Sequence, residues 1–179
     1  MKKFLVIALV LSLLAVSALA EDKVTVTGAQ MDWNQSTIDA FVKDGFDGNM
    51  ATVTLTDGKQ FKIMVPDGFA QRDLTEDEKA TGVAVAIANA QTGAEYRILD
   101  CKFETAENLT DVAKTLEGIV SSSQYALVNG VAALITSIEA EDSMNATFEL
   151  GDHRYVQIDF TPVNGNNKLI PYLIASVQF

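Results

Sequence analysis

The side chains best suited to nucleophilic or acid–base chemistry are few in this chain. His153 is the only histidine and follows Gly-Asp in a short polar segment. A serine hydrolase needs a histidine as general base beside a nucleophile and an orienting acid. Ser121, Ser122 and Ser123 could supply the hydroxyl, but no G-x-S-x-G elbow surrounds them. We therefore interpret His153 as an exposed turn residue and assign no catalytic residue.

Cys101 is the only cysteine, so it cannot form a disulfide within the chain. It lies in an alternating segment in which Leu99, Cys101 and Phe103 share one face of a strand. Free cysteine is among the most buried residue types. We predict a small buried hydrophobe rather than a reactive thiol. With one His and one Cys, a zinc site would have to rely on carboxylates, and we assign no metal site or cofactor.

Two acidic segments leave alternative functions open. Residues 44–49 (Asp-Gly-Phe-Asp-Gly-Asn) look like a calcium loop, but Phe46 and Gly48 stand where an EF-hand requires oxygen ligands. Glu139, Glu141 and Asp142 could supply the paired carboxylates of a glycosidase. A Gly-rich turn and a solvated loop explain these segments more simply. A calcium-stabilised surface module and a secreted hydrolase using acidic residues remain the alternatives to a binding domain.

The N-terminal segment 1–20 has the composition of an export signal. A basic start is followed by an apolar run over 4–15, and Ala18-Leu19-Ala20 offers an A-x-A cleavage site before Glu21. The apolar run is short for a membrane span. We predict a signal peptide over 1–20 and a single secreted α+β domain over 21–179, without a stable membrane anchor after cleavage. The expected location is secreted or extracytoplasmic, in a bacterium.

The chain is strongly acidic, with 24 acidic and 13 basic residues and a formal net charge of −11. Loss of Lys2 and Lys3 with the leader would take this charge to −13. Such a surface repels nucleic-acid phosphates and acidic lipid headgroups, so we exclude nucleic acid as a partner. The charge is compatible with cations or basic partners, and equally with simple solubility.

Hydrophobic periodicity and turn residues predict an antiparallel sheet with a few helices. The predicted strands are 23–27, 51–56, 60–65, 83–89, 95–103, 125–128, 131–137, 145–150 and 154–160. Four helices are predicted. The first is capped by Ser36 and ends at Gly45, and the second begins at a capping box at Thr75. The other two cover residues 109–120 and 169–177. Asp57-Gly58 predicts a type I′ turn in the first hairpin, and Asn129-Gly130 turns another. Strands joined by tight turns are antiparallel, so the fold class is α+β.

Several segments carry a resemblance to a known family. Residues 61–69 (Phe-Lys-Ile-Met-Val-Pro-Asp-Gly-Phe) are similar to the strand and P-x-G-[WF] opening of the PsbP-like superfamily. Similar segments follow in the same order at 109–117, 128–133, 154–160 and 174–177. The resemblance implies an α/β/α sandwich, with about six antiparallel strands flanked by helices and an extra N-terminal strand and short helix before Asn49.

The superfamily includes the extrinsic photosystem protein, a Ran-binding nuclear protein and many bacterial secreted proteins. It implies no shared catalytic residues, so no residue role is transferred to this chain. We therefore expect a non-enzymatic extracytoplasmic domain that binds an unknown protein, envelope component or small ligand. Trp33, in the extra N-terminal segment, either packs over the sheet, which we favour, or marks the interface.

Overall fold

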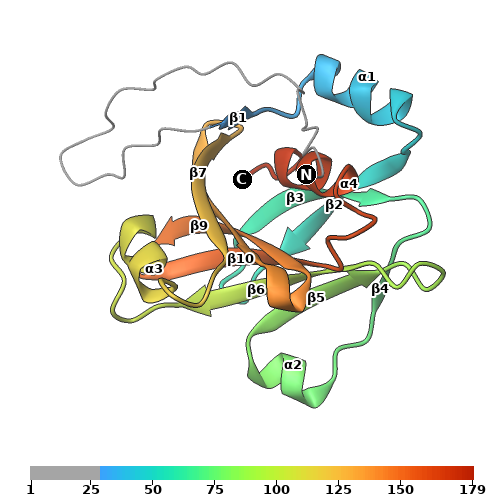
Figure 1. Cartoon of the computed structure of the whole chain (residues 1–179). Helices are drawn as coiled ribbons and strands as arrows, with labels where there is room; N and C mark the ends of the chain where they lie inside the picture. The colour runs from blue at the N-terminus through green and yellow to red at the C-terminus, as the bar shows by residue number, and fades with distance from the viewer. Residues whose placement is uncertain (1–28) are drawn as a thin grey trace.

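The computed structural model describes residues 29–179 (Figure 1). The predicted signal peptide and the predicted strand 23–27 lie outside the described residues. The strands are β1 (Ala29–Met31), β2 (Gly48–Thr54), β3 (Gln60–Pro66), β4 (Ala70–Arg72), β5 (Val83–Ala88), β6 (Glu95–Lys102), β7 (Ser122–Val128), β8 (Val131–Ile138), β9 (Ser143–Gly151) and β10 (Arg154–Thr161). The helices are α1 (Gln35–Lys43), α2 (Glu76–Ala80), α3 (Leu109–Thr115) and α4 (Leu169–Ala175), with a 3-10 turn, η1 (Glu139–Glu141).

The main sheet is larger than predicted and is mixed. Its eight strands run in the order β1-β7-β8-β9-β10-β6-β5-β4, while β2 and β3 form a separate two-stranded sheet. β1 pairs with β7 in parallel, whereas the other neighbours are antiparallel. The predicted α+β class is correct, and six of the predicted strands are present as the antiparallel strands β5 to β10. The sheet is not simply six antiparallel strands, because β4 and the parallel strand β1 extend it at its two edges. β1 and β4 have three residues each, too few to show a period.

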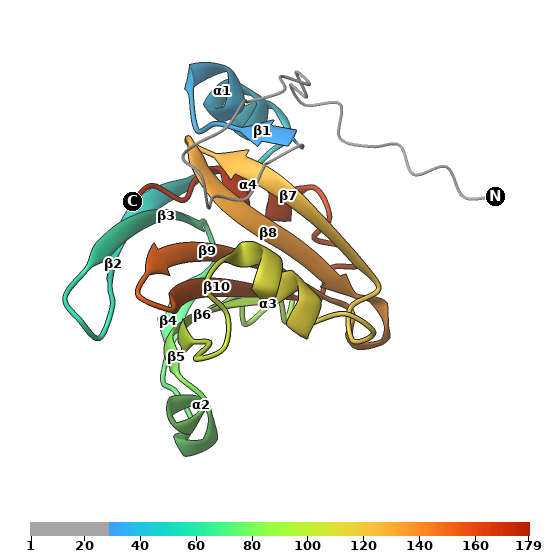
Figure 2. The ribbon, with the colours of Figure 1, turned by 90° about the vertical axis from the view of Figure 1, so that its left-hand side faces the viewer.

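The two faces of this sheet carry different layers. The β2–β3 hairpin, α1 and α4 cover one face and enclose the main core, which includes Phe61, Tyr96, Phe148 and Leu173. α3 lies on the opposite face (Figure 2), where Leu109 and Val112 pack on Leu134 and Tyr155. One outer layer is thus a mixture of helices and a hairpin, which differs from the helical layer on each side that an α/β/α sandwich implies.

The first hairpin has a different turn from the one predicted. Gly58 has a φ of +85°, but Asp57 is not among the residues with positive φ, so the turn is not type I′. The Gly58 amide bonds to the Leu55 carbonyl at 3.0 Å, and the Asp57 side chain accepts from the Lys59 amide at 2.9 Å. This geometry is a type I turn followed by a left-handed glycine. The type I′ turn lies instead at Asn129-Gly130, where φ is 48° and 81°.

Three helix ends also differ from the predictions. Asn34, not Ser36, caps α1, because its side chain accepts from the Thr37 amide at 3.1 Å. α3 ends at Thr115, and Gly118 with a φ of +81° turns the chain away, which leaves Ile119 exposed. α4 ends at Ala175. The capping box at Thr75 and the hairpin at Asn129-Gly130 are present as predicted.

Asn129 joins the N-terminal segment, the β7–β8 turn and the C-terminus of α4. Its side-chain oxygen accepts from the Trp33 amide at 2.7 Å. Its side-chain nitrogen donates to the carbonyls of Ala175 and Val177, each at 2.7 Å, which satisfies groups at the end of α4. Its own amide donates to the Met31 carbonyl at 3.0 Å, next to the parallel β1–β7 pairing.

Candidate functional site

A continuous row of directly opposed residues crosses the face of the sheet on which α3 lies. We call it the polar row. From β4 to β7 it consists of Arg72, Ala86, Arg97, Asp159, Asn145, Thr136 and Ser123. Opposed residues on one face of an antiparallel pair are about 5 Å apart at Cβ, so their side chains interact. Ala86 is the only apolar member, on a face whose neighbouring residues Leu134 and Tyr155 belong to a core.

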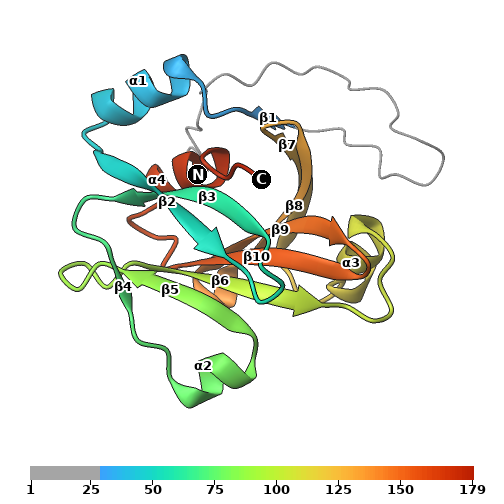
Figure 3. The same cartoon turned by 180° about the vertical axis from the view of Figure 1, so that it is seen from behind.

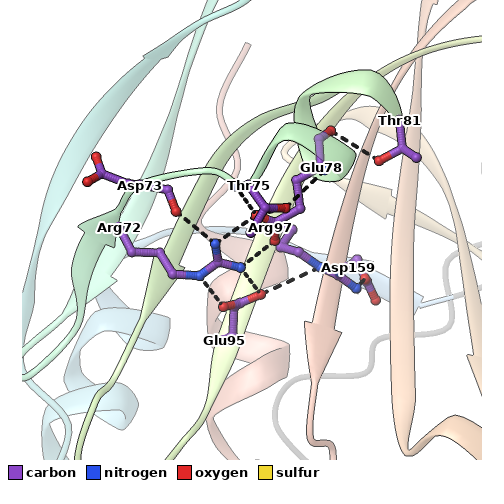
Figure 4. A network of polar contacts seen from close by, with 8 residues as sticks. All are labelled: Arg72, Asp73, Thr75, Glu78, Thr81, Glu95, Arg97 and Asp159. Atoms are coloured by element: carbon purple, nitrogen blue, oxygen red, sulfur yellow. Dashed lines mark hydrogen bonds and ion pairs between the residues drawn. The ribbon is translucent and has the colours of Figure 1, made fainter.

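The charged end of the polar row is held by Arg72 (Figure 4). Its Nε donates to Glu95 at 2.6 Å, and its terminal nitrogens donate to both oxygens of Glu78, at 2.9 and 2.5 Å. The hydrogen bonds from Arg72 are the main reason that the pKa of Glu78 is lowered to about 2. These bonds from Arg72 to two carboxylates connect α2 to the first residue of β6. Arg72 and Glu78 therefore stabilise the fold and are not available to bind a ligand.

Arg97 and Asp159 form the centre of the polar row. One terminal nitrogen of Arg97 bonds to Asp159, and Arg97 Nε lies 3.6 Å from Glu95 Oε1. Burial raises the pKa of Asp159 despite this opposite charge, and Glu141 and Glu95 raise it further. The Arg97 side chain is 33% exposed, so this ion pair is recessed but reaches solvent.

Polar atoms without partners gather at the centre and the neutral end of the polar row. Arg97 Nε, Thr136 Oγ1 and Asn145 Oδ1 are buried, and none has a hydrogen-bond partner among the described residues. Thr147 Oγ1, a fourth such atom, belongs to the residue two positions after Asn145 on β9 and faces the same side. Thr136 and Thr147 are 1% and 0% exposed. Buried polar groups normally have partners, so we take this patch as the candidate site.

The residues considered for a hydrolytic triad, and not assigned to one, are not brought together. His153 lies in the β9–β10 turn, where its Nδ1 is 2.9 Å from the Ala106 carbonyl. The Ser122 hydroxyl bonds to the Ser137 hydroxyl at 2.7 Å. Ser137 on β8 lies opposite Met144 on β9, and Met144 lies opposite Phe160, near the end of β10 that is farthest from His153. The histidine is exposed at a turn, as predicted. The serines and this histidine therefore occupy opposite ends of the sheet.

Acidic side chains in each of the two segments accept hydrogen bonds from other groups of the protein. Asp44 accepts from the Tyr172 hydroxyl at 3.0 Å, and Asp47 accepts from the Gly48 amide at 2.8 Å. Asp142 has a φ of 50° and accepts from the Asn164 amide at 3.0 Å. Within residues 29–179, no three Asp, Glu, His or Cys side chains converge as a metal site would require.

Cys101 and Trp33 both pack on apolar neighbours. Cys101 is partly buried, less than predicted, and packs with Phe103 against the core that contains Tyr155 beneath α3. Burial, with a smaller effect from Asp100, raises the pKa of its thiol to about 11. Trp33 packs edge-to-face on Phe41, with ring centroids 5.8 Å apart, and is partly exposed. Its packing contact is thus with α1 at the edge of the main core.

One hollow in the described part of the chain has little room for a ligand. It lies between the end of β10 and α4, is lined by Phe69, Tyr96, Phe160 and Leu173 among others, and encloses about 10 Å³. That volume fits about one water molecule. Pockets for small ligands usually measure about 300–1,000 Å³. Among the helices of residues 29–179, none has both the length and the apolar character that crossing a bilayer requires.

Known proteins provide one informative comparison. No protein-family model and no curated protein matches the chain. The solution structure of cyanobacterial PsbP (CyanoP) from Synechocystis sp. PCC 6803 is similar to it, with a TM-score of 0.51 over 74% of this chain and 93% of that chain, at 9% sequence identity. The chain has a PsbP-like fold. The family resemblance read from the sequence is therefore confirmed at the level of fold.

The sequence reading did not find the polar row within this PsbP-like sheet. A signal was available, because Arg97, Asn145, Thr147 and Asp159 alternate with buried apolar residues along their strands. Their position on one face follows from that alternation. Their position in a single row depends on the strand order β9-β10-β6 and its register, which alternation within each strand does not reveal.

Proposed function

We propose that this protein is a non-enzymatic extracytoplasmic binding domain, and that it engages its partner at the polar row around Arg97, Asp159 and Asn145. The observation that carries this proposal is the set of four buried polar atoms without partners on one patch. Leaving a buried donor or acceptor unpaired costs about 1–3 kcal/mol. Proteins tolerate such costs at sites where function requires the groups.

The composition of the patch favours binding over catalysis. Arg97 and Asp159 neutralise each other, and the other unpaired groups are two hydroxyls and an amide oxygen. A group of this kind can accept and donate hydrogen bonds but offers no nucleophile with an adjacent base. His153 and Cys101 lie elsewhere, so the chemistry they could provide is separate from the patch.

The test is retention of the purified domain on envelope preparations from the cell that makes it. The informative variant carries Thr136→Val and Thr147→Val, which remove two of the unpaired hydroxyls and keep the side-chain shape. We expect its apparent affinity to fall by about tenfold, which corresponds to about 1.4 kcal/mol. Thr105→Val, the same change at an exposed position in the connection between β6 and α3, is the control and should bind like the wild type. Equal retention of all three proteins would remove the polar row as the binding site.

A further inference from the structure

The outer edge of β2 is a long strand edge that none of the described residues pairs with. β2 pairs with β3 alone, from Gly48 opposite Pro66 to Thr54 opposite Gln60, without a register shift. Every second residue of β2 therefore directs its backbone amide and carbonyl away from β3, without a strand partner among the described residues. The hairpin lies at the margin of the molecule in Figure 2 and on the side facing the viewer in Figure 3, so a further strand could approach it.

This edge lacks the features by which proteins usually block strand pairing. Natural edge strands are short, or carry lysine, proline or a bulge. β2 has seven residues, Gly-Asn-Met-Ala-Thr-Val-Thr, with no charge and no proline. By contrast, the edge strands β1 and β4 of the main sheet have three residues each.

The opposite edge of the same hairpin already holds an extended segment. The Lys62 amide donates to the Gln178 carbonyl at 2.8 Å, and the Gln178 amide donates to the Lys62 carbonyl at 2.9 Å. Gln178 thus forms a single antiparallel bridge with Lys62 of β3. One edge of the hairpin is occupied in the way that we infer for the other.

The hairpin is held firmly at both ends, so an incoming strand meets a preformed edge. At the turn, Arg154 bonds to Asp57 and also to both oxygens of Asp100 at 2.7 Å. At the other end, the Asp67 amide donates to the Asp47 carbonyl at 2.8 Å. A preformed site avoids most of the ordering cost of binding.

We propose that the outer edge of β2 binds an extended peptide segment of a partner protein by strand addition, and that this segment carries a basic residue at the end beside Asp47 and Asp67. Main-chain hydrogen bonds give affinity in this mode, and alternate side chains give specificity. Asp47 and Asp67 are exposed next to Gly48, and the whole chain has a net charge of −11. A basic segment is therefore attracted to that end.

A second copy of the chain fits this edge less well than a basic peptide. Two chains of net charge −11 repel each other, and Asp47 and Asp67 of each copy would add to that repulsion. A pair of seven-residue strands also buries little area, whereas stable interfaces bury about 1,200–2,000 Å².

The experiment uses the isotope-labelled protein and three synthetic peptides. The first, Gln-Phe-Lys-Ile-Met-Val-Lys, copies β3 except for a final lysine, which antiparallel pairing places opposite Gly48. The second ends in glutamate instead, and the third is N-methylated at alternate backbone amides. We expect the first peptide to shift the β2 amide resonances and to slow their hydrogen exchange. The second should bind several-fold more weakly, with a difference that shrinks at high salt, and the third should not bind.

Three results would overturn this proposal. Equal binding of the N-methylated peptide would mean that apolar contact, not strand pairing, holds it. Slow exchange of all β2 amides in the free monomer would mean that the chain itself covers the edge. Slow exchange together with a dimeric mass in solution would mean that a second copy occupies it.

Discussion

Arg97 on β6 and Asp159 on β10 are direct cross-strand partners, and their ion pair lies in the middle of the polar row. On one side of Asp159 stands the guanidinium of Arg97, and on the other stands Asn145, whose side-chain oxygen has no hydrogen-bond donor among residues 29–179. The carboxylate therefore lies between a cation and an unpaired acceptor. The protonation state of Asp159 should therefore change the free energy of unfolding by a measurable amount.

Asp159→Asn should change the dependence of stability on pH. Because burial raises the folded pKa of Asp159 above the ordinary value of 3.8, the folded state binds its proton more tightly than the unfolded state. This group therefore favours folding at low pH, and its contribution is lost as pH rises through the folded pKa. Urea unfolding of wild type and variant from pH 3.5 upward should show the relative stability of the wild type falling over that window. A constant difference between them would contradict the raised pKa.

Glu78→Gln should produce the opposite dependence. The pKa of Glu78 is lowered from 4.5 to about 2, so its contribution to stability is complete above about 4.5 and is lost as pH falls toward 2. The variant should be less stable than the wild type at pH 7 and should approach it near pH 2. Glu76→Gln, in the same helix but 90% exposed, is the matched control and should have little effect.

Replacement of Asn129 should loosen the N-terminal segment and the end of α4 together. Asn129→Gly keeps the left-handed backbone but removes the side-chain bonds to Trp33, Ala175 and Val177. We expect a loss of about 2–4 kcal/mol, since each buried group left unpaired costs about 1–3 kcal/mol. Trp33 fluorescence should shift to the red as its surroundings become wetter. A variant with wild-type stability and an unchanged spectrum would show that this junction is unimportant.

The Cys101 thiol should react slowly near neutral pH. Its pKa is raised to about 11 by burial, and the thiolate is the reactive species. The rate of modification by a thiol reagent should rise steadily with pH up to about 11 in the folded protein. The chain unfolded in urea should react much faster and level off near the ordinary thiol pKa of about 8.5. Fast reaction of the folded protein at pH 7 would contradict the buried position of Cys101.

The sequence predicted those elements whose signals are local. Alternation along β6 and β10 and the Asn129-Gly130 turn identify strands and a hairpin without knowledge of their neighbours. The parallel pairing of β1 with β7 was not predictable in this way, because it depends on contacts between residues far apart, such as Asn129 with Met31. The Asp57-Gly58 turn was assigned the wrong type because the connection has five residues, 55–59, and a type I′ turn requires a two-residue loop.

The site was harder to predict than the fold. His153, Ser121 and Glu139 attracted notice because their residue types are common in active sites. The Glu139 amide does donate to the Ser121 hydroxyl, but His153 lies at the opposite end of the sheet. Thr136, Asn145 and Thr147 are ordinary strand residues in sequence, and only their burial without partners distinguishes them. That property arises from the register of β8, β9 and β10, which is a tertiary feature.

The central claim is that the buried polar groups without partners, at and beside the polar row, are kept for binding and not for stability. The most direct test is the free energy of unfolding of the Thr136→Val, Thr147→Val protein in urea, measured on the same preparation used for retention. Because both hydroxyls are buried without partners, we expect this protein to be as stable as the wild type, or more stable by about 1 kcal/mol, while its apparent affinity falls by about tenfold. A fall in stability of more than about 1 kcal/mol with binding unchanged would show that the hydroxyls serve the fold, and would contradict the account.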